Sequence, residues 1–292
     1  MDRQNTKIAN RVSAVSLAVN GILSAAKLFV GIIARSGAMI SDAAHSASDV
    51  FSTLVVIAGV NLGSKAPDQK HRYGHDRFES VAALVLASIL LMTGLVIIRQ
   101  ACQNAQLAFL GRLSSPGALA LAAAGVSIAV KEWMYWYTRN AAKKLGSQAL
   151  MADAWHHRSD ALSSVGSLAG IAGARLGFPI LDPIASIVIA LLILKVAFDI
   201  AKESVAKLTD EACDEQTEES IRRVILSQQG VLGIDEMKTR MFSSWFYVDV
   251  DIQADASLPL SEAHRIAESV HRSVEREFPQ ARHCMVHVNP DR

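Results

Sequence analysis

Residues 81–98 read VAALVLASILLMTGLVII, a continuous run without a charged side chain. An α-helix needs about 20 mostly apolar residues to cross the hydrocarbon core of a bilayer, and the segment from Phe78 to Ile98 reaches that length. Over the whole chain of 292 residues, 51% are hydrophobic and only 20% are charged. Soluble domains of this size carry more charge. The run therefore predicts a membrane-spanning helix and an integral membrane protein.

Five further apolar segments of similar length accompany this run, which is third in chain order. They are residues 12–34, 37–62, 116–137, 150–176 and 180–200. The second and the fifth of the six segments are unusually polar in their first halves. Beyond the sixth segment the chain becomes polar and mixed in composition. We therefore expect an all-α, six-helix transmembrane domain over residues 1–208 and a cytoplasmic domain over residues 209–292.

Lysine and arginine predict the orientation of these helices. They gather in the N-terminal tail, between the second and third segments, and between the fourth and fifth segments, whereas the alternate loops hold fewer. The positive-inside rule then places both termini in the cytoplasm, which agrees with an even number of helices. We expect a multi-pass protein of the inner (plasma) membrane. The formal net charge of +1 gives no reason to expect a nucleic-acid partner.

The polar tail reads as a small α/β domain. The expected order is helix, strand, strand, helix, strand, over residues 215–228, 234–242, 245–255, 261–278 and 284–288. Ser261 is expected to cap the second helix. In the second strand Val248, Val250 and Ile252 alternate with polar residues, so one face should be core and the other wet. This α-β-β-α-β order matches a ferredoxin-like half, and so small a domain often dimerises.

One eight-residue pattern, D-A-x-H-x-x-S-D, occurs in both polar segments. Residues 42–49 read DAAHSASD and residues 153–160 read DAWHHRSD. Positions i and i+4 share one face of a helix, so each copy presents an imidazole and a carboxylate together. The residues on these two faces are His45, Asp49, His156 and Asp160. Packed against each other, the two segments would offer two nitrogens and two oxygens to a tetrahedral divalent ion.

Burying these carboxylates needs a compensating interaction. The four motif aspartates together would cost on the order of 10 kcal/mol if they were ionised at mid-bilayer. A cavity, a cation or a partner offsets such a cost, and transporters place substrate sites where related segments face each other. We interpret the leading Asp42 and Asp153 as helix caps or as residues along the access path. His157 and Arg158 are expected to point away from the His156 face, toward solvent or a partner.

Two sequence signatures give the chain a family resemblance. Residues 71–80, HRYGHDRFES, resemble the H-x-[YF]-G-H-x-[KR]-x-E-S signature of the cation diffusion facilitators, and residues 153–160 resemble that family's signature in helix five. The resemblance implies a homodimeric metal/proton antiporter with its transport site in helices two and five. The His-Asp/His-Asp combination resembles the zinc-selective members. Imidazole ligands also suit Fe²⁺, Co²⁺ and Ni²⁺, which are the alternative substrates.

The resemblance also implies a second metal site in the loop between helices two and three. Asp68, His71 and His75 match its ligands. Their spacing would also place them on one face of a helix. The alternative is that they are solvated loop residues at the start of a helix. In addition, Arg77 is expected to form a salt link with Asp210 or Glu211, which would join the membrane domain to the tail.

Family tails often hold a histidine-rich zinc site, and here the match is incomplete. The positions that correspond to it are Asp235, Asp251, His264, His287 and Asn289. Two expected histidines are aspartates and one expected carboxylate is an asparagine. A tail site would therefore be weak, absent, or reduced to Asp249 or Asp251 with the two histidines. His271 and His283 match none of the family's roles.

These features predict secondary active efflux of a divalent ion, Zn²⁺ first, by alternating access. Binding requires neutral imidazoles and ionised carboxylates, so protons compete with the metal and can be exchanged for it. A membrane-anchored metal sensor is one rival, but it would need a strong metal site in the tail. An intramembrane metallohydrolase is another, but its usual helical H-E-x-x-H motif is absent from the sequence. We therefore do not expect an enzyme.

Overall fold

The structure is a computed structural model that describes residues 3–33, 37–109, 118–175, 181–242 and 245–291. The chain divides into two compact units, Met1–Val205 and Ala206–Arg292, and each is considered by itself.

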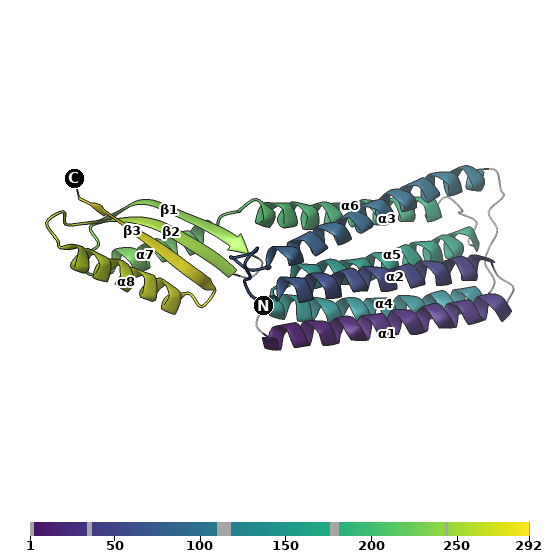
Figure 1. The fold of residues 1–292 in the computed structure, drawn as a ribbon. Helices are drawn as coiled ribbons and strands as arrows, with labels where there is room; N and C mark the ends of the chain where they lie inside the picture. Colours follow the sequence, from purple (N-terminus) through teal and green to yellow (C-terminus); the bar gives the residue numbers. More distant parts are fainter. Residues whose placement is uncertain (1–2, 34–36, 110–117, 176–180, 243–244, 292) are drawn as a thin grey trace. The chain divides into compact units, whose positions relative to one another are not determined.

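Six long helices make up the N-terminal part of the described chain (Figure 1). They are α1 (Arg3–Ile33), α2 (Gly37–Gly63), α3 (Arg77–Phe109), α4 (Ala118–Leu145), α5 (Gln148–Arg175) and α6 (Leu181–Leu208). The shortest, α2, has 27 residues and the longest, α3, has 33. At about 1.5 Å per residue, even the shortest reaches about 40 Å, the thickness of a bilayer with its headgroup regions. The predicted six-helix domain is confirmed.

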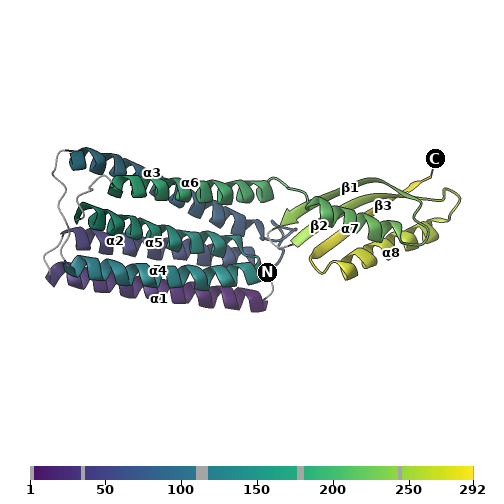
Figure 2. The same cartoon turned by 180° about the vertical axis from the view of Figure 1, so that it is seen from behind.

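The helices of this unit pack side by side (Figures 1 and 2). Helix α1 contacts α2 and α4, α4 contacts α5, and α3 lies against both α2 and α5. Buried Leu90 and Ile97 of α3 pack with Ala190 and Ile193 of α6. A Cβ atom on Gly59 of α2 would overlap the Ala82 side chain of α3. Small residues let membrane helices approach closely, so Gly59 allows α2 to lie directly against α3.

The outer surface of the six helices is rich in large apolar side chains. Those at least 60% exposed include Ile22, Phe29, Phe51, Met92 and Phe198. Within the described part, Gln4–Phe29 and Arg77–Leu107 are each long and apolar enough to cross a membrane. A large apolar surface of this kind is suited to contact with lipid rather than with water.

The tail has the predicted order of elements. It consists of α7 (Glu215–Leu226), β1 (Gly233–Phe242), β2 (Trp245–Ala254), α8 (Leu260–Glu277) and β3 (Ala281–Pro290). Strand β2 is central, antiparallel to β1 and parallel to β3. The predicted cap at Ser261 is wrong, because α8 begins one residue earlier, after Pro259, without a side-chain cap hydrogen bond.

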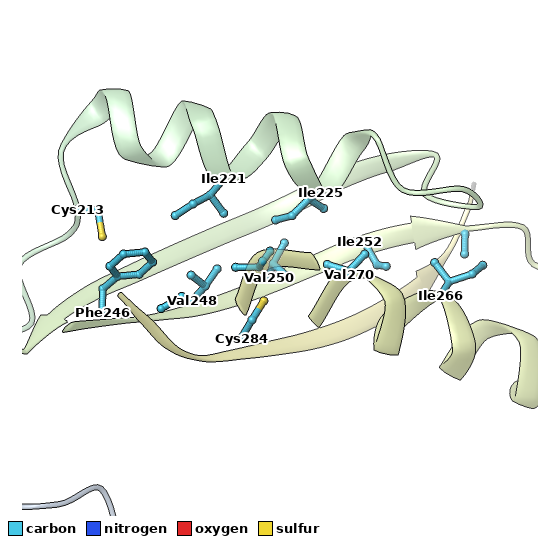
Figure 3. Close-up of a cluster of buried hydrophobic side chains, with 13 residues drawn as sticks. Cys213, Ile221, Ile225, Phe246, Val248, Val250, Ile252, Ile266, Val270 and Cys284 are labelled. Carbon is cyan, nitrogen blue, oxygen red and sulfur yellow. The ribbon is translucent and has the colours of Figure 1, made fainter. Parts of the chain in front are cut away.

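One face of the sheet is packed under α7 and α8. Val248, Val250 and Ile252 of β2 are at most 2% exposed and meet Ile221 of α7 and Val270 of α8 (Figure 3). The alternating residues of β2 stay partly exposed on the opposite face. The predicted alternation is therefore confirmed, and the tail has a hydrophobic core of its own.

Two cysteines of the tail are expected to be chemically inert. Cys284 is 1% exposed, and burial raises the pKa of its thiol to about 12. Burial also raises the pKa of the Cys213 thiol. At pH 8 only roughly one Cys284 in 10⁴ would be the reactive thiolate. Iodoacetamide should therefore leave both thiols unmodified in the folded protein and label them after denaturation, as read by peptide mass spectrometry. Rapid labelling of folded Cys284 would contradict this.

Candidate metal centre

Three of the predicted transport-site residues form one cluster inside the six-helix unit. Asp49 comes from α2, and His156 and Asp160 come from α5. Each offers a ligand atom, and these atoms lie within 4.8 Å of one another. The Nε2 atom of His156 is 3.4 Å from Oδ1 of Asp49. The three residues are 2%, 3% and 8% exposed, so two helices far apart in sequence bring buried ligands to one place.

The fourth predicted ligand, His45, lies in α2 one turn before Asp49. Its side chain is outside the part of the chain that the structure describes, as is that of Asp42. The role of His45 therefore stays a prediction.

A lysine that the sequence analysis missed lies in the centre of this cluster. Nζ of Lys131, on α4, donates hydrogen bonds to Oδ2 of Asp49 at 2.5 Å and to Oδ2 of Asp160 at 2.9 Å. Lys131 is only 3% exposed. A signal for it existed, since Lys131 and the adjacent Glu132 interrupt the otherwise uncharged segment 116–137. An ionisable residue inside a membrane segment is itself a reason to suspect a functional site.

The ammonium bridges carboxylates from two different helices. Opposite charges 4 Å apart attract by about 4 kcal/mol at an effective dielectric constant of about 20. Lys131 therefore offsets much of the repulsion between Asp49 and Asp160. A divalent ion bound by the same two oxygens would take the place of the ammonium. An imidazole with two carboxylates is a donor set that such an ion accepts.

Two expectations for the second motif copy are wrong. Of the two roles predicted for Asp153, the cap is wrong, because α5 begins earlier, at Gln148, whereas a role along the access path stays a prediction. Asp153 and His157 are both 0% exposed, and Nε2 of His157 is 3.4 Å from Oδ2 of Asp153. His157 thus faces the protein interior rather than solvent, because the neighbouring helices cover both sides of α5. The Arg158 guanidinium lies over the ring of Tyr135, 4.3 Å from its centre.

The loop residues Asp68, His71 and His75 form a second cluster, again with ligand atoms within 4.8 Å. They belong to the turns between α2 and α3, so the expected helical face is wrong. Oδ1 of Asp68 accepts the backbone N–H of His71 at 2.7 Å, and this hydrogen bond lowers the pKa of the Asp68 carboxyl. Nε2 of His75 is 3.4 Å from the other carboxylate oxygen. Whether the cluster binds metal stays a prediction.

The five tail residues predicted as ligands do not come together as a metal-binding group within the described part of the chain. They are Asp235, Asp249, Asp251, His264 and His287. Asp235 accepts hydrogen bonds from Gln253 and Asn289. Asp249 and Asp251 alternate with the core residues of β2, so they lie on the open face of the sheet. Helix α8, which carries His264, covers the other face.

The predicted salt link stays a prediction. Arg77 belongs to the first compact unit and Asp210 to the second.

Comparison with protein families decides the identity of the chain. The cation efflux transmembrane domain matches residues 13–209, and the cytoplasmic domain of cation efflux proteins matches residues 213–291. The chain belongs to the cation diffusion facilitator family. It is a membrane-embedded transporter of divalent metal ions and not an enzyme.

Curated relatives cover nearly all of this transporter. Metal tolerance protein C1 of Arabidopsis thaliana is 36% identical over 92% of this chain, which spans only 59% of that protein. The manganese efflux system protein MneP of Bacillus subtilis is 31% identical, with 99% of each chain covered. MneS, from the same organism and also named a manganese efflux system protein, is 33% identical over 94% of this chain. Solved structures titled MamM CTD cover 27% of the chain at 19% identity and a TM-score of 0.26.

Proposed function

We propose that this transporter exports Zn²⁺ from the cytoplasm in exchange for protons, with His45, Asp49, His156 and Asp160 as the ligands. The cluster of Asp49, His156 and Asp160 carries the proposal. Its residues are buried, come from both copies of the repeat, and supply the nitrogen and oxygen donors that zinc binds. With His45 the set becomes two imidazoles and two carboxylates. Fe²⁺, Co²⁺ and Ni²⁺ accept similar donors and are secondary candidates.

Manganese is a second candidate substrate, because two relatives are named manganese efflux proteins. Mn²⁺ prefers oxygen ligands and binds nitrogen-containing sites more weakly than zinc does. In competition for uptake into wild-type proteoliposomes, we therefore expect zinc to be preferred over manganese by at least about tenfold. His156→Asp should shift this ratio toward manganese. Competitive uptake of the two ions measures it, and a wild-type preference for manganese would make manganese the substrate.

Lys131 has a defined part in this proposal. Its ammonium neutralises Asp49 and Asp160 when no metal is bound, and the arriving ion displaces it from the two oxygens that it contacts. When the metal leaves, the lysine returns to the carboxylates. The empty site can then switch between facing the cytoplasm and facing the outside without two unpaired buried charges. Such charges would be costly in a membrane.

Proton exchange follows from the chemistry of the ligands. Protons compete with metal for imidazoles and carboxylates, so an inward proton gradient should drive metal outward. We expect zinc accumulation in proteoliposomes to rise with an imposed pH gradient and to collapse when a protonophore removes it. Zinc flux that stays the same with and without the gradient would contradict the exchange.

The topology belongs to the same proposal. Both termini would lie in the cytoplasm of a cell whose inner membrane holds the transporter, and the tail would join two copies in a homodimer. The placement of basic residues supports the orientation, and the match to the family's cytoplasmic domain supports the assignment of the tail. Protease cleavage of the tail in inside-out but not in right-side-out vesicles would test the orientation.

A further inference from the structure

Three side chains with no part in the transport site meet where α8 faces β3. His271 and Glu275 are one helical turn apart on α8, and His283 lies near the start of β3. Each offers a ligand atom, and these atoms lie within 4.8 Å of one another. Oε1 of Glu275 is 3.4 Å from Nε2 of His271 and 3.5 Å from Nδ1 of His283. The carboxylate thus stands between two imidazoles.

These separations suit a shared tetrahedral ion. Zinc binds imidazole nitrogen and carboxylate oxygen at about 2.0–2.2 Å, so neighbouring ligand atoms around it are about 3.3–3.6 Å apart. The two distances from Glu275 already fall in this range. The two imidazole nitrogens lie within 4.8 Å of each other, so binding an ion requires little movement of the side chains.

The orientation of His271 points independently to a ligand. Its Nδ1 atom is 2.7 Å from the carbonyl oxygen of Cys284. A carbonyl oxygen only accepts hydrogen bonds, so Nδ1 carries the proton and donates it. In the neutral tautomer Nε2 then carries the lone pair, and this atom is the one that faces Glu275 at 3.4 Å. Metal-binding histidines commonly donate their other ring N–H to a backbone carbonyl in this way, which fixes the ring and its tautomer.

The three side chains are partly exposed, so an ion can reach them, and the elements that carry them are packed into the core of the tail. The side chains of His271, Glu275 and His283 are 28%, 35% and 46% exposed. Water can therefore complete the coordination, as it does in zinc sites with three protein ligands. Both flanking elements belong to the hydrophobic core of the tail, through Val270 and Val274 of α8 and Cys284 of β3.

We propose that His271, Glu275 and His283 bind one divalent ion of the zinc class, meaning Zn²⁺, Co²⁺ or Ni²⁺, in the tail. Two imidazoles favour these ions over Mn²⁺, Mg²⁺ and Ca²⁺, which prefer oxygen ligands. The ion ties α8 to the edge strand β3 and stabilises that contact in proportion to the free metal concentration. The site is independent of the transport cluster, so it stands whether or not zinc is the transported ion.

Zinc stoichiometry of the purified, metal-free full-length protein tests this site. Equilibrium dialysis at low micromolar free Zn²⁺ is compared for the wild type, His283→Ala and Glu275→Gln. We expect each variant to bind one ion fewer per chain than the wild type. The matched controls are Glu262→Gln and Glu268→Gln, which change carboxylates of α8 that pair with Arg265 and Arg272 instead, and both should keep the wild-type number. Equal stoichiometry in all five proteins, or the same loss in the controls, would overturn the proposal.

A second measurement needs no variant and so does not depend on how a variant folds. Diethylpyrocarbonate modifies imidazole nitrogens that are free to react, and peptide mass spectrometry reads each histidine separately. In the wild type, Zn²⁺ should protect His271 and His283 at least about tenfold, because a metal bond occupies the reactive nitrogen. If Glu275 only forms ion pairs with protonated histidines, zinc will leave both modification rates unchanged, and the metal site is then excluded.

Discussion

Asp160→Asn should reduce metal transport by at least about 100-fold, the largest effect expected of any single change in this protein. Losing a residue that merely supports a ligand costs 10- to 100-fold in metal affinity or activity, so losing a charged ligand should cost at least about as much. Asparagine keeps the size of the side chain, and its amide oxygen can still accept the hydrogen bond from Lys131. The protein should therefore fold and reach the membrane. Zinc flux into proteoliposomes measures the effect.

The matched control is Asp199→Asn, because Asp199 is an exposed aspartate on α6 outside the cluster. It makes the same chemical change in the same unit, and its flux should stay within about twofold of wild type, as for surface substitutions in general. Comparable flux through Asp160→Asn and the wild type would remove Asp160 from the site. The proposal for the tail site would be unaffected, because it is read by binding stoichiometry.

Lys131→Met should tighten metal binding while slowing transport. The methionine side chain fills a similar volume but leaves Asp49 and Asp160 without the ammonium that they contact. A metal then no longer displaces a cation whose attraction to each carboxylate is on the order of 4 kcal/mol. Part of that energy returns as affinity, so we expect binding roughly 10- to 100-fold tighter, at 1.4 kcal/mol for each factor of ten. Isothermal titration with Zn²⁺ measures the affinity.

The same variant should turn over more slowly, because its empty site holds two carboxylates with no resident cation. Its thermal stability should be low without metal and should rise steeply when Zn²⁺ is added. Lys131→Arg keeps the charge and should keep affinity closer to that of the wild type, which separates loss of charge from loss of shape. If Lys131→Met folds fully in the presence of metal and its zinc affinity is unchanged or weaker, then the lysine does not compete with the ion.

Much of the fold could be predicted because membrane helices and half-buried strands each follow a simple physical rule. The run 81–98 requires a spanning helix, since no water is present in the bilayer to bind an exposed backbone. The alternation of Val248 and Val250 with polar residues requires a sheet with one covered face. Errors arose at element ends, where Ser261 proved to lie inside α8, because caps depend on the local backbone.

The candidate site, like the fold, could be predicted from the sequence only in part. The repeat in residues 42–49 and 153–160 identified the helices, and the i, i+4 spacing identified the faces, because helical periodicity is local. The assignment of His157 to solvent failed because burial depends on which neighbouring helices cover α5. Lys131 was missed for a related reason: its sequence position marks it as unusual, but nothing local shows which side chains it meets.

The sequence by itself therefore determined the membrane domain, the order of helices and strands along the tail, and the repeated pair of histidine and aspartate, since periodicity and hydropathy carry that information along the chain. Only the tertiary structure placed the Lys131 ammonium between Asp49 and Asp160, and only it gathered His271, Glu275 and His283. Both arrangements join residues from different elements. Their distances depend on how helices and strands pack, which no local pattern of residues encodes.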